Sequence, residues 1–388
     1  MNDSIYMREA LRLARKGFGA TSPNPMVGAV LVRGGRIIGR GWHHRAGWPH
    51  AEIEVLRDAQ KRGHSPRGAT LFVTLEPCCT QGRTPPCTDA LIAARIRRVV
   101  IGATDPNPRH AGKGFGLLRR AGIDVVAIGA PLADECLKLN EAFNHWIVRR
   151  TPFVTVKAAM TLDGKIATAG GESKWITGEK ARACGMKLRR GSDAILVGIN
   201  TILADNPSLT VRDEGKNKGN IQPSTPNIQR PGLRRIVLDS RARTSLDAKV
   251  VSDEFGALTT IVVGPHAPKK RVAALARRVH VMIAPTIKSG SSATRHPSLD
   301  LRWLLKKLGA ENVTSLLVEG GGEVNASFLL GGLAQRVAFF YAPKILGGRD
   351  AHSGVAGAGA KNLRDAVPLR EVGWHRLGDD LLLTARVG

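Results

Sequence analysis

The chain has 388 residues, of which 43% are hydrophobic and 23% are charged. This composition is typical of a globular protein, and the length is too great for one ordinary core, so we expect two domains. No apolar run is long enough to span a membrane, and the N-terminus lacks the apolar stretch of a signal peptide. We therefore expect a cytoplasmic protein with no membrane partner.

The net charge of +26 is large enough to raise the question of nucleic-acid binding. The basic excess is spread over both halves of the chain, and no dense basic run is interleaved with aromatic residues. Two tyrosines and nine phenylalanines are too few to suggest platforms for stacked bases. We favour an anionic small-molecule substrate with no nucleic-acid partner, and keep nucleic-acid binding as the alternative.

The first 150 residues alternate apolar runs of strand character with amphipathic runs of helical spacing. We expect helices over residues 5–16, 50–62, 87–95 and 137–147, and strands over residues 27–32, 70–75 and 99–102. His50 begins the second of these helices and Cys87 begins the third. Both residues would therefore lie at helix N-termini, where the helix dipole favours a thiolate.

Metal-binding residue types occur at these helix starts and directly after the strand expected over 70–75, in the order His50-Ala51-Glu52, Glu76-Pro77-Cys78 and Cys87. One imidazole and two thiolates would leave the fourth position of a tetrahedral Zn²⁺ open for water, as in catalytic zinc sites. Glu52 would not bind the metal but would carry protons, which is the arrangement of zinc deaminases. The two cysteines are further apart than in the usual signature, so we expect a substrate-facing loop between them.

Two other interpretations of these cysteines remain open. Cys78 and Cys87 could be small buried residues, or Cys79 could complete a closed structural zinc site. The chain has five cysteines, an odd number with three of them clustered, which favours metal binding over a disulfide framework. The ordered pair of motifs favours the catalytic interpretation.

After Thr151-Pro152 the pattern changes to strands separated by helices, which indicates a second α/β domain. We place the two domains at residues 1–148 and 152–388. The strands expected in the second domain cover residues 153–158, 194–198, 235–238, 259–264, 279–283, 315–319 and 336–341, with a turn at 161–165. Residues 214–232 and 354–360 are expected to be loops.

The best candidate for a nucleotide site covers residues 317–323, where a strand leads into three glycines and then a helix over 324–330. Glycines let backbone N–H groups approach a phosphate at a helix N-terminus. The pattern is not G-x-G-x-x-G, so a standard Rossmann domain is not indicated. A tight turn without a ligand is an equal alternative for this segment.

Ordered short motifs along essentially the whole chain resemble those of the bifunctional riboflavin-biosynthesis deaminase/reductase family. In the first half the matching segments are residues 21–28, 50–52, 75–78, 82–87 and 105–108. In the second half they are residues 152–154, 157, 162–167, 171–173, 175–177, 205–207, 209–212, 318–321 and 343–348. The segment at 82–87 separates this family from cytidine and transfer-RNA deaminases.

The resemblance implies an α/β protein with a cytidine-deaminase-like three-layer α/β/α domain followed by a dihydrofolate-reductase-like α/β domain. It implies zinc-dependent hydrolytic deamination of 2,5-diamino-6-ribosylamino-4(3H)-pyrimidinone 5′-phosphate. NADPH would then reduce the ribosyl group to give 5-amino-6-ribitylamino-uracil 5′-phosphate. The cofactors would be one Zn²⁺ per chain in the first domain and NADPH in the second. We expect a homo-oligomer, and an enzyme with one active domain and one scaffold domain is the alternative.

In the first domain the resemblance implies that Asn24 and His43 hydrogen-bond the pyrimidine or ribose, beside the zinc ligands and Glu52. A turn residue and a surface histidine are the alternative roles of these two. Arg83 would bind phosphate or be solvated. The family usually has a histidine, thought to touch substrate, where this chain has Thr80. A threonine can still make one hydrogen bond, so we expect altered affinity rather than lost activity.

In the second domain the resemblance places both ligands. NADPH would contact Ala159, Trp175, Thr201, Asp205, Ser240, Gly321, Gly322, Glu323, Val324 and Asn325. The substrate would contact Ser173, Arg189, Leu209, Arg212 and Glu319. Arg189 and Arg212 can form bidentate pairs with a phosphate. Lys157 would either polarise or protonate the reacting sugar oxygen as a catalytic residue or form a structural salt bridge with Asp163.

Overall fold

The computed structural model describes residues 3–81, 85–211, 232–287 and 298–388. The chain divides into two compact units, Met1–Arg150 and Thr151–Gly388. The sequence places the boundary between residues 148 and 152, on either side of this division.

The first unit is built on one five-stranded sheet. Its strands are β1 (Gly28–Arg33), β2 (Arg36–Trp42), β3 (Thr70–Val73), β4 (Arg98–Ile101) and β5 (Asp124–Ala127). Its helices are α1 (Asp3–Ala14), the 3₁₀ turn η1 (Arg15–Gly17), α2 (Ala51–Lys61), α3 (Cys87–Ala93), α4 (Lys113–Arg120), α5 (Leu132–Leu139) and α6 (Glu141–Arg149). The strand order is β2-β1-β3-β4-β5.

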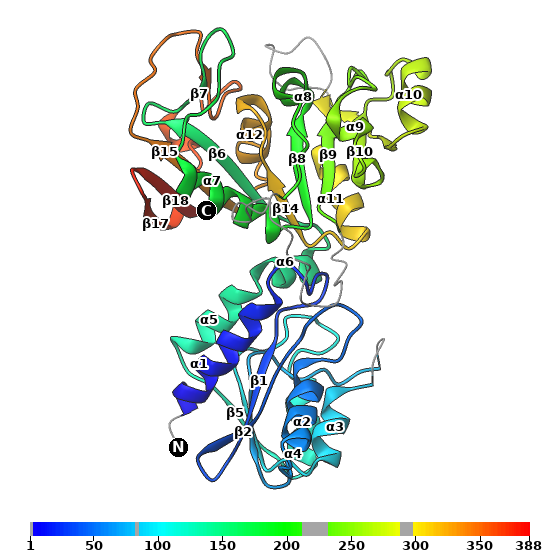
Figure 1. The fold of residues 1–388 in the computed structure, drawn as a ribbon, viewed down its shortest axis with the longest axis vertical. Helices are drawn as coiled ribbons and strands as arrows, with labels where there is room; N and C mark the ends of the chain where they lie inside the picture. The colour runs from blue at the N-terminus through cyan, green and yellow to red at the C-terminus, as the bar shows by residue number, and fades with distance from the viewer. Residues whose placement is uncertain (1–2, 82–84, 212–231, 288–297) are drawn as a thin grey trace, which may run out of the picture. The chain divides into compact units, whose positions relative to one another are not determined.

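Helices cover both faces of this sheet, which gives three layers (Figure 1). Helices α1 and α5 lie on one face, and α2, α3 and α4 lie on the other. Strands β1 and β3 are almost entirely buried because both of their faces are covered. The pair β1–β2 and the pair β1–β3 are antiparallel, whereas β3, β4 and β5 run parallel.

The helix expected over residues 137–147 is two helices, α5 and α6, which meet at Asn140. The Asn140 side chain accepts a hydrogen bond from the Met26 backbone N–H and donates one to the Met26 carbonyl oxygen. This pair of bonds fixes the chain just after Asn24, so the break between the helices braces a segment that was expected to bind substrate. Periodicity does not register an interaction between residues this far apart in the chain.

The second unit contains a nine-stranded sheet. The strands of the unit are β6 (Phe153–Thr161), β7 (Lys165–Ala167), β8 (Ala194–Gly198), β9 (Arg234–Leu238), β10 (Thr259–Val263), β11 (His280–Ile283), β12 (Thr286–Ile287), β13 (Ser298–Leu299), β14 (Ser315–Val318), β15 (Arg336–Ala342), β16 (His352–Ser353), β17 (Leu369–Leu377) and β18 (Asp380–Val387). The helices are α7 (Glu179–Arg190), α8 (Ile199–Asp205), α9 (Lys249–Ser252), α10 (Lys269–Ala276), α11 (Leu301–Ala310) and α12 (Gly322–Leu329), with 3₁₀ turns η2 (Gly256–Leu258) and η3 (Leu363–Asp365).

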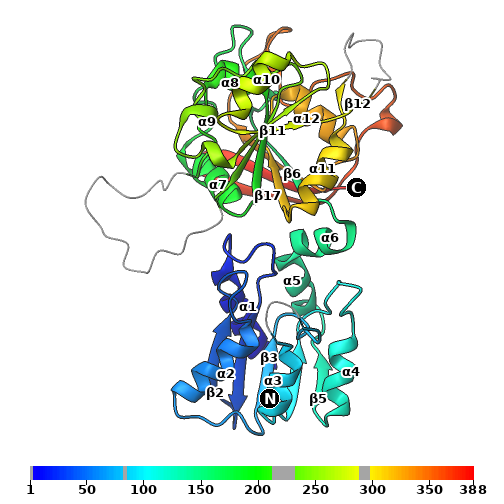
Figure 2. The same ribbon diagram turned by 90° about the vertical axis from the view of Figure 1, so that its right-hand side faces the viewer.

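The order of the large sheet is β11-β10-β9-β8-β14-β6-β15-β18-β17. The strands from β11 to β15 are parallel, and β18 and β17 add an antiparallel edge. Figure 2 shows α11 and α12 on one side of this sheet and α7, α8 and α9 on the other. Alternate residues of β8 therefore enter different cores, with Ala194 and Leu196 in one and Ile195 and Val197 in the other.

All seven expected strands of this unit are present, six of them with shifted ends. The strand expected over 153–158 continues to Thr161, and the antiparallel strands β17 and β18 were not anticipated. Residues 354–360 carry neither helix nor strand, as expected for a loop. The loop expected over 214–232 lies, apart from its last residue, outside the described residues. Within the part of the chain that the structure describes, no helix is long and apolar enough to cross a membrane.

Candidate functional site

The three predicted metal ligands come together in the first unit. His50 Nδ1 lies 3.5 Å from Cys78 Sγ and 3.3 Å from Cys87 Sγ. His50 is the N-cap of α2 and Cys87 is the first residue of α3, so both occupy the predicted helix starts. The Cys87 backbone N–H also donates to Cys78 Sγ across 3.3 Å. Two helix N-termini therefore converge on one cluster of nitrogen and sulfur ligands.

The spacing of these atoms fits a tetrahedral zinc ion. Zn–S bonds of about 2.3 Å and Zn–N bonds of about 2.0–2.1 Å place a nitrogen and a sulfur roughly 3.6 Å apart in a tetrahedron. The two nitrogen–sulfur distances above are close to this separation. The pKa of Cys78 is lowered to about 4, chiefly by its hydrogen bond with the Cys87 thiol and further by His50, so a thiolate is available as a ligand.

Cys79 does not join the cluster. Its Sγ lies 3.7 Å from His110 Nδ1 instead. In the described parts of the chain, the one group of three or more His, Cys, Asp or Glu side chains with metal-ligand spacing is His50, Cys78 and Cys87. This geometry argues against a closed structural site and leaves a fourth position for water.

Glu52 lies in the first turn of α2 and is only 3% exposed. Burial raises the pKa of its carboxyl to about 7, and the negative charge of Cys78 adds to this effect. A carboxyl with a pKa near neutrality can both accept and return a proton at physiological pH. The position and environment of Glu52 are those required of a general acid–base group.

His43 is 2% exposed, so the alternative of a surface histidine is wrong. Its Nδ1 lies 3.0 Å from the Pro49 carbonyl oxygen, and its Nε2 lies 3.1 Å from Asn24 Nδ2. A neutral ring that donates from Nδ1 to Pro49 accepts at Nε2 from the Asn24 amide. Burial lowers the pKa of His43 to about 4, which agrees with a neutral ring. Asn24 Oδ1 is then the amide atom turned to accept a further hydrogen bond.

In the second unit, predicted ligand-binding residues gather at the carboxyl ends of neighbouring parallel strands. Ala159 lies near the end of β6, Thr201 and Asp205 lie in α8 after β8, Ser240 follows β9 and Glu319 follows β14. These four strands are adjacent in the sheet. Ligands of open α/β sheets bind at this edge, so the structure brings together residues that are far apart in sequence.

Glu319 is the centre of a buried ionic cluster at this edge. Its two carboxylate oxygens accept bonds of 2.8 Å from Arg189 Nε and Nη2, and Lys157 Nζ lies 3.5 Å away. Burial alone would raise the pKa of Glu319, but the charges of Lys157 and Arg189 outweigh it and hold the pKa at about 2. The Arg189 fork expected to bind phosphate is therefore occupied by a carboxylate, and Arg189 Nη1 donates to the Thr210 carbonyl oxygen.

The ion pair of Lys157 is with Glu319 and not with Asp163, so the proposed Lys157–Asp163 salt bridge is wrong. Asp163 accepts hydrogen bonds from the Thr161 hydroxyl and from the backbone N–H groups of Leu346 and Gly347. These bonds hold the pKa of Asp163 at about 2. Asp163 therefore ties the turn after β6 to the loop after β15.

The three glycines after β14 serve different purposes. A Cβ on Gly320 would lie 2.5 Å from Val324 Cβ, and one on Gly322 would meet the Ser353 carbonyl oxygen, so these two positions require glycine for packing. A Cβ on Gly321 would have nothing within 4 Å. Gly321 is the N-cap of α12, whose first-turn N–H groups have no partner within the helix. An open glycine beside such groups fits a dinucleotide phosphate.

Three of the predicted cofactor residues, all in α12, make contacts within the protein. The Asn325 side chain is fully buried and donates to the Gly354 carbonyl oxygen across 2.8 Å. Glu323 Oε1 lies 3.4 Å from the Gly357 backbone N–H, and Val324 packs against the core of the unit. These contacts hold the loop after β16 against the start of α12.

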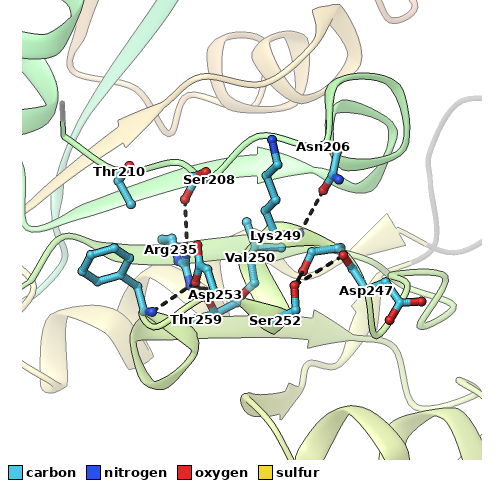
Figure 3. Close-up of polar contacts among 12 residues, drawn as sticks. Asn206, Ser208, Thr210, Arg235, Asp247, Lys249, Val250, Ser252, Asp253 and Thr259 are labelled. Carbon is cyan, nitrogen blue, oxygen red and sulfur yellow. Dashed lines mark hydrogen bonds and ion pairs between the residues drawn. The ribbon is translucent and has the colours of Figure 1, made fainter. Parts of the chain in front are cut away.

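The sequence did not reveal Arg235, which is fully buried in β9. Its guanidinium pairs with Asp253 at 2.7 and 2.8 Å and donates to Thr259 Oγ1 and to the carbonyl oxygens of Ser208 and Val250 (Figure 3). The Ser208 contact ties β9 to the loop after α8, which also carries Leu209 in a left-handed conformation at φ +54°. A pattern search overlooks a cation that serves as a core residue.

Trp175 and Ser173 are two further residues predicted to contact ligands in the second unit. Trp175 is 64% exposed and has the Arg182 guanidinium 4.8 Å from its ring centre, so one ring face remains for a ligand. Ser173 Oγ lies 3.4 Å from Asp205 Oδ1. Arg83 and Arg212, both expected near substrate phosphate, lie outside the described residues.

Two protein families match this chain. Residues 1–103 match the cytidine and deoxycytidylate deaminase zinc-binding region, and residues 152–383 match the RibD C-terminal domain. The riboflavin biosynthesis protein RibD of Actinobacillus pleuropneumoniae is 42% identical over 383 residues, which cover 99% of this chain and 95% of that protein. The chain belongs to the RibD family of riboflavin biosynthesis proteins.

Other RibD proteins extend the match. That of Aquifex aeolicus is 40% identical over 98% of this chain and 97% of its own length. The structure of Acinetobacter baumannii RibD superposes with a TM-score of 0.82 at 34% identity, covering 100% of this chain and 99% of that one. A Thermotoga maritima structure, described as a diaminohydroxyphosphoribosylaminopyrimidine deaminase/5-amino-6-(5-phosphoribosylamino)uracil reductase, gives 0.78 at 35% identity over 100% and 99% of the two chains. The expected class, a cytidine-deaminase-like unit followed by a reductase-like α/β unit, is confirmed.

Proposed function

We propose that this protein catalyses two consecutive steps of riboflavin biosynthesis. The first unit hydrolyses the 2-amino group of 2,5-diamino-6-ribosylamino-4(3H)-pyrimidinone 5′-phosphate and releases ammonia. The second reduces the ribosyl group with NADPH to give 5-amino-6-ribitylamino-uracil 5′-phosphate. The observation that carries this assignment is the cluster of three metal ligands, together with the buried carboxyl of Glu52 on the helix that His50 caps.

In the first unit, His50, Cys78 and Cys87 would hold the metal, with the pyrimidine beside them. A zinc ion held there would supply Lewis acidity. Glu52 would take a proton from the attacking water and deliver it to the leaving amine. Asn24 Oδ1 accepts a hydrogen bond from the substrate, and His43 keeps the Asn24 amide in that orientation.

In the second unit, the cofactor lies along the carboxyl edge of β6, β8, β9 and β14. NADPH, when bound, supplies the hydride. The N–H groups at the start of α12 would hold its diphosphate, the open face of Trp175 would take a ring, and the Asp205 carboxylate would accept a hydrogen bond from a ribose hydroxyl. Ala159, Thr201 and Ser240 line the same edge.

Lys157 is the acid that faces the reacting sugar oxygen, and Glu319 holds its ammonium group in place. Ser173, Leu209 and Arg212 contact the substrate. Arg189 supports the site through Glu319 and the Thr210 carbonyl oxygen. Any contact it makes with the substrate phosphate uses its remaining N–H groups.

We assign the deaminase activity to residues 1–148 and the reductase activity to residues 152–388, in a cytoplasmic enzyme. We also propose a homo-oligomer, because β17 is an edge strand of the large sheet with exposed apolar side chains. Val372 and Trp374 on this strand are 49% and 58% exposed. Light scattering on the purified protein measures the mass, and a monomer at micromolar concentration would contradict the oligomer.

The test of the two activities is metal analysis combined with product analysis of the diaminopyrimidinone phosphate, with and without NADPH. We expect about one zinc per chain, deaminated product without NADPH, and ribityl product when NADPH is added. Zinc-free protein without deaminase activity would refute the first assignment. Deamination without any ribityl product would reduce the second unit to a scaffold.

The role of Lys157 has its own test. Lys157→Met keeps the length of the side chain and removes the acid. We expect the reductase kcat to fall by roughly 10²-fold, the low end of general acid–base effects, with deamination unchanged. An unchanged reductase rate would remove Lys157 from the mechanism.

A further inference from the structure

The loop over residues 105–114 is clamped to the segment that carries the ligand Cys78. Glu76, two residues before the ligand, is 4% exposed. Its carboxylate oxygens accept hydrogen bonds of 3.1, 3.0 and 2.9 Å from the backbone N–H groups of Asp105, Gly112 and Gly114. A Cβ on Gly114 would lie 2.7 Å from the Pro77 carbonyl oxygen. The loop therefore has one position relative to the metal-binding segment.

This loop places an imidazole at the rim of the metal centre. The Asn107 carbonyl oxygen accepts hydrogen bonds from the N–H groups of His110 and Ala111, and the Asp105 carboxylate accepts one from the Asn107 N–H. The turn so formed directs the His110 ring at the residues after Cys78. His110 Nδ1 lies 3.7 Å from Cys79 Sγ, and Nε2 lies 3.5 Å from Thr80 Oγ1.

The rim around His110 favours an anion. Arg109 lies next to His110 and Lys113 begins α4, and both are exposed. The carboxylates of Glu76 and Asp105 both accept hydrogen bonds from backbone N–H groups of this segment. The contacts of His110 with Cys79 and Thr80, at 3.7 and 3.5 Å, are long for hydrogen bonds, so a ring N–H can exchange its contact for a stronger acceptor.

We propose that His110 binds the 5′-phosphate of the pyrimidine substrate in the first unit. This inference rests on the proposed deaminase function. The reacting ring carbon must lie beside the metal, and the phosphate lies beyond the ribose, so its partners belong at the rim and not at the metal itself. Thr80, where the family resemblance leads one to expect a histidine, lies beside the His110 ring. In this chain an imidazole reaches the same place from a different loop.

The test is a cycle that removes the imidazole and the phosphate separately. The substrates are the diaminopyrimidinone phosphate and its dephosphorylated riboside, and the variant is His110→Ala in the full-length zinc-loaded protein. With the phosphorylated substrate we expect the deaminase KM to rise roughly 10- to 100-fold, the size of one charge-assisted hydrogen bond, with kcat changed by less than about 3-fold. With the riboside we expect the variant and the unsubstituted protein to have the same KM.

Two further variants separate binding from packing and from overall charge. Arg120→Ala removes an exposed cation from the far end of α4 and should change KM by less than about 3-fold. Thr80→His added to His110→Ala returns an imidazole to the rim and should recover most of the lost affinity. Zinc content and reductase activity are measured on every variant and should not change.

The outcomes distinguish this inference from the function on which it rests. An equal rise in KM for both substrates would show that His110 supports the loop and does not bind phosphate, and no rise would exclude a role in binding. Either result would overturn the inference. If the unsubstituted protein deaminates neither substrate, the proposed function itself fails.

Discussion

The two units build their sites in different ways. In the first, His50, Glu52 and Cys87 come from short motifs at the starts of α2 and α3 and Cys78 from the segment after β3, and the three ligands lie together as their residue types suggest. In the second, the site is an edge shared by four strands, and its most strongly charged residues are bonded to one another. Lys157, Arg189 and Glu319 come from β6, α7 and the end of β14.

This difference decides how far residue type predicts role. A metal ion requires a fixed set of donor atoms, so the meeting of His50, Cys78 and Cys87 in one cluster points directly to metal binding. A buried arginine or lysine must be paired, whether or not it also binds a ligand. Arg189 meets that requirement with Glu319, and Arg235 meets it with Asp253. Charge therefore marks function in the first unit and packing as well as function in the second.

The strongest test of this comparison is Cys87→Ala. We expect bound zinc to fall from about one per chain to near zero and deamination to be abolished, because two ligands cannot hold the ion in its catalytic geometry. The matched control is Cys79→Ala, which removes the neighbouring thiol outside the cluster and should keep the zinc. Metal analysis and ammonia release measure both. Loss of zinc from the Cys79 variant would restore the closed-site interpretation.

Glu52→Gln should have the next largest effect. We expect deaminase kcat to fall by roughly 10²- to 10⁴-fold with zinc retained, because the amide cannot transfer the proton. Glu54→Gln, on the same helix turn and paired with the exposed Arg57, is the control and should retain its rate. A Glu52 variant with full activity would leave the proton transfer to another group.

In the second unit, Glu319→Gln should lower the free energy of unfolding by roughly 3–5 kcal/mol, because two buried cations lose their shared counter-charge. The control is Glu311→Gln, whose ion pair with Arg234 is partly exposed and should be worth at most about 1 kcal/mol. Hydrogen–deuterium exchange of peptides from residues 151–388, measured across a urea series, reports on this unit alone and does not depend on catalysis. Equal effects of the two substitutions would show that the Glu319 cluster stabilises the fold no more than a partly exposed ion pair does.

The same cluster should make the free energy of unfolding of the second unit depend on pH in the acid range. The pKa of Glu319 is about 2 in the folded chain and 4.5 in the reference state. Because the folded value is the lower one, its contribution to stability is complete above about pH 5 and is lost as the pH falls from 4.5 towards 2. Urea midpoints of the second unit measured from neutral into acidic pH give this slope, and Glu319→Gln should flatten it. An unchanged slope in the variant would assign the acid sensitivity to other carboxylates.

The two-domain α/β organisation, most strands and the zinc cluster follow from the sequence alone. Hydrophobic periodicity is a local property, and metal-binding motifs consist of residue types whose chemistry is restrictive. The sequence predicts His50 and Cys87 at helix starts, and the structure has them there. The cofactor residues come from the family resemblance, and the parallel sheet collects several of them at its carboxyl edge.

The hydrogen-bond and ion-pair partners of the charged and polar side chains depend instead on the tertiary structure. Asn140 divides an expected helix because it bonds to Met26, and Lys157 pairs with Glu319 in place of Asp163. His110 faces Thr80 because Glu76 accepts hydrogen bonds from the loop that carries His110. A buried charge or amide must find a partner wherever the folded chain supplies one. That partner depends on distances between segments far apart in the chain, which no local pattern of residues contains.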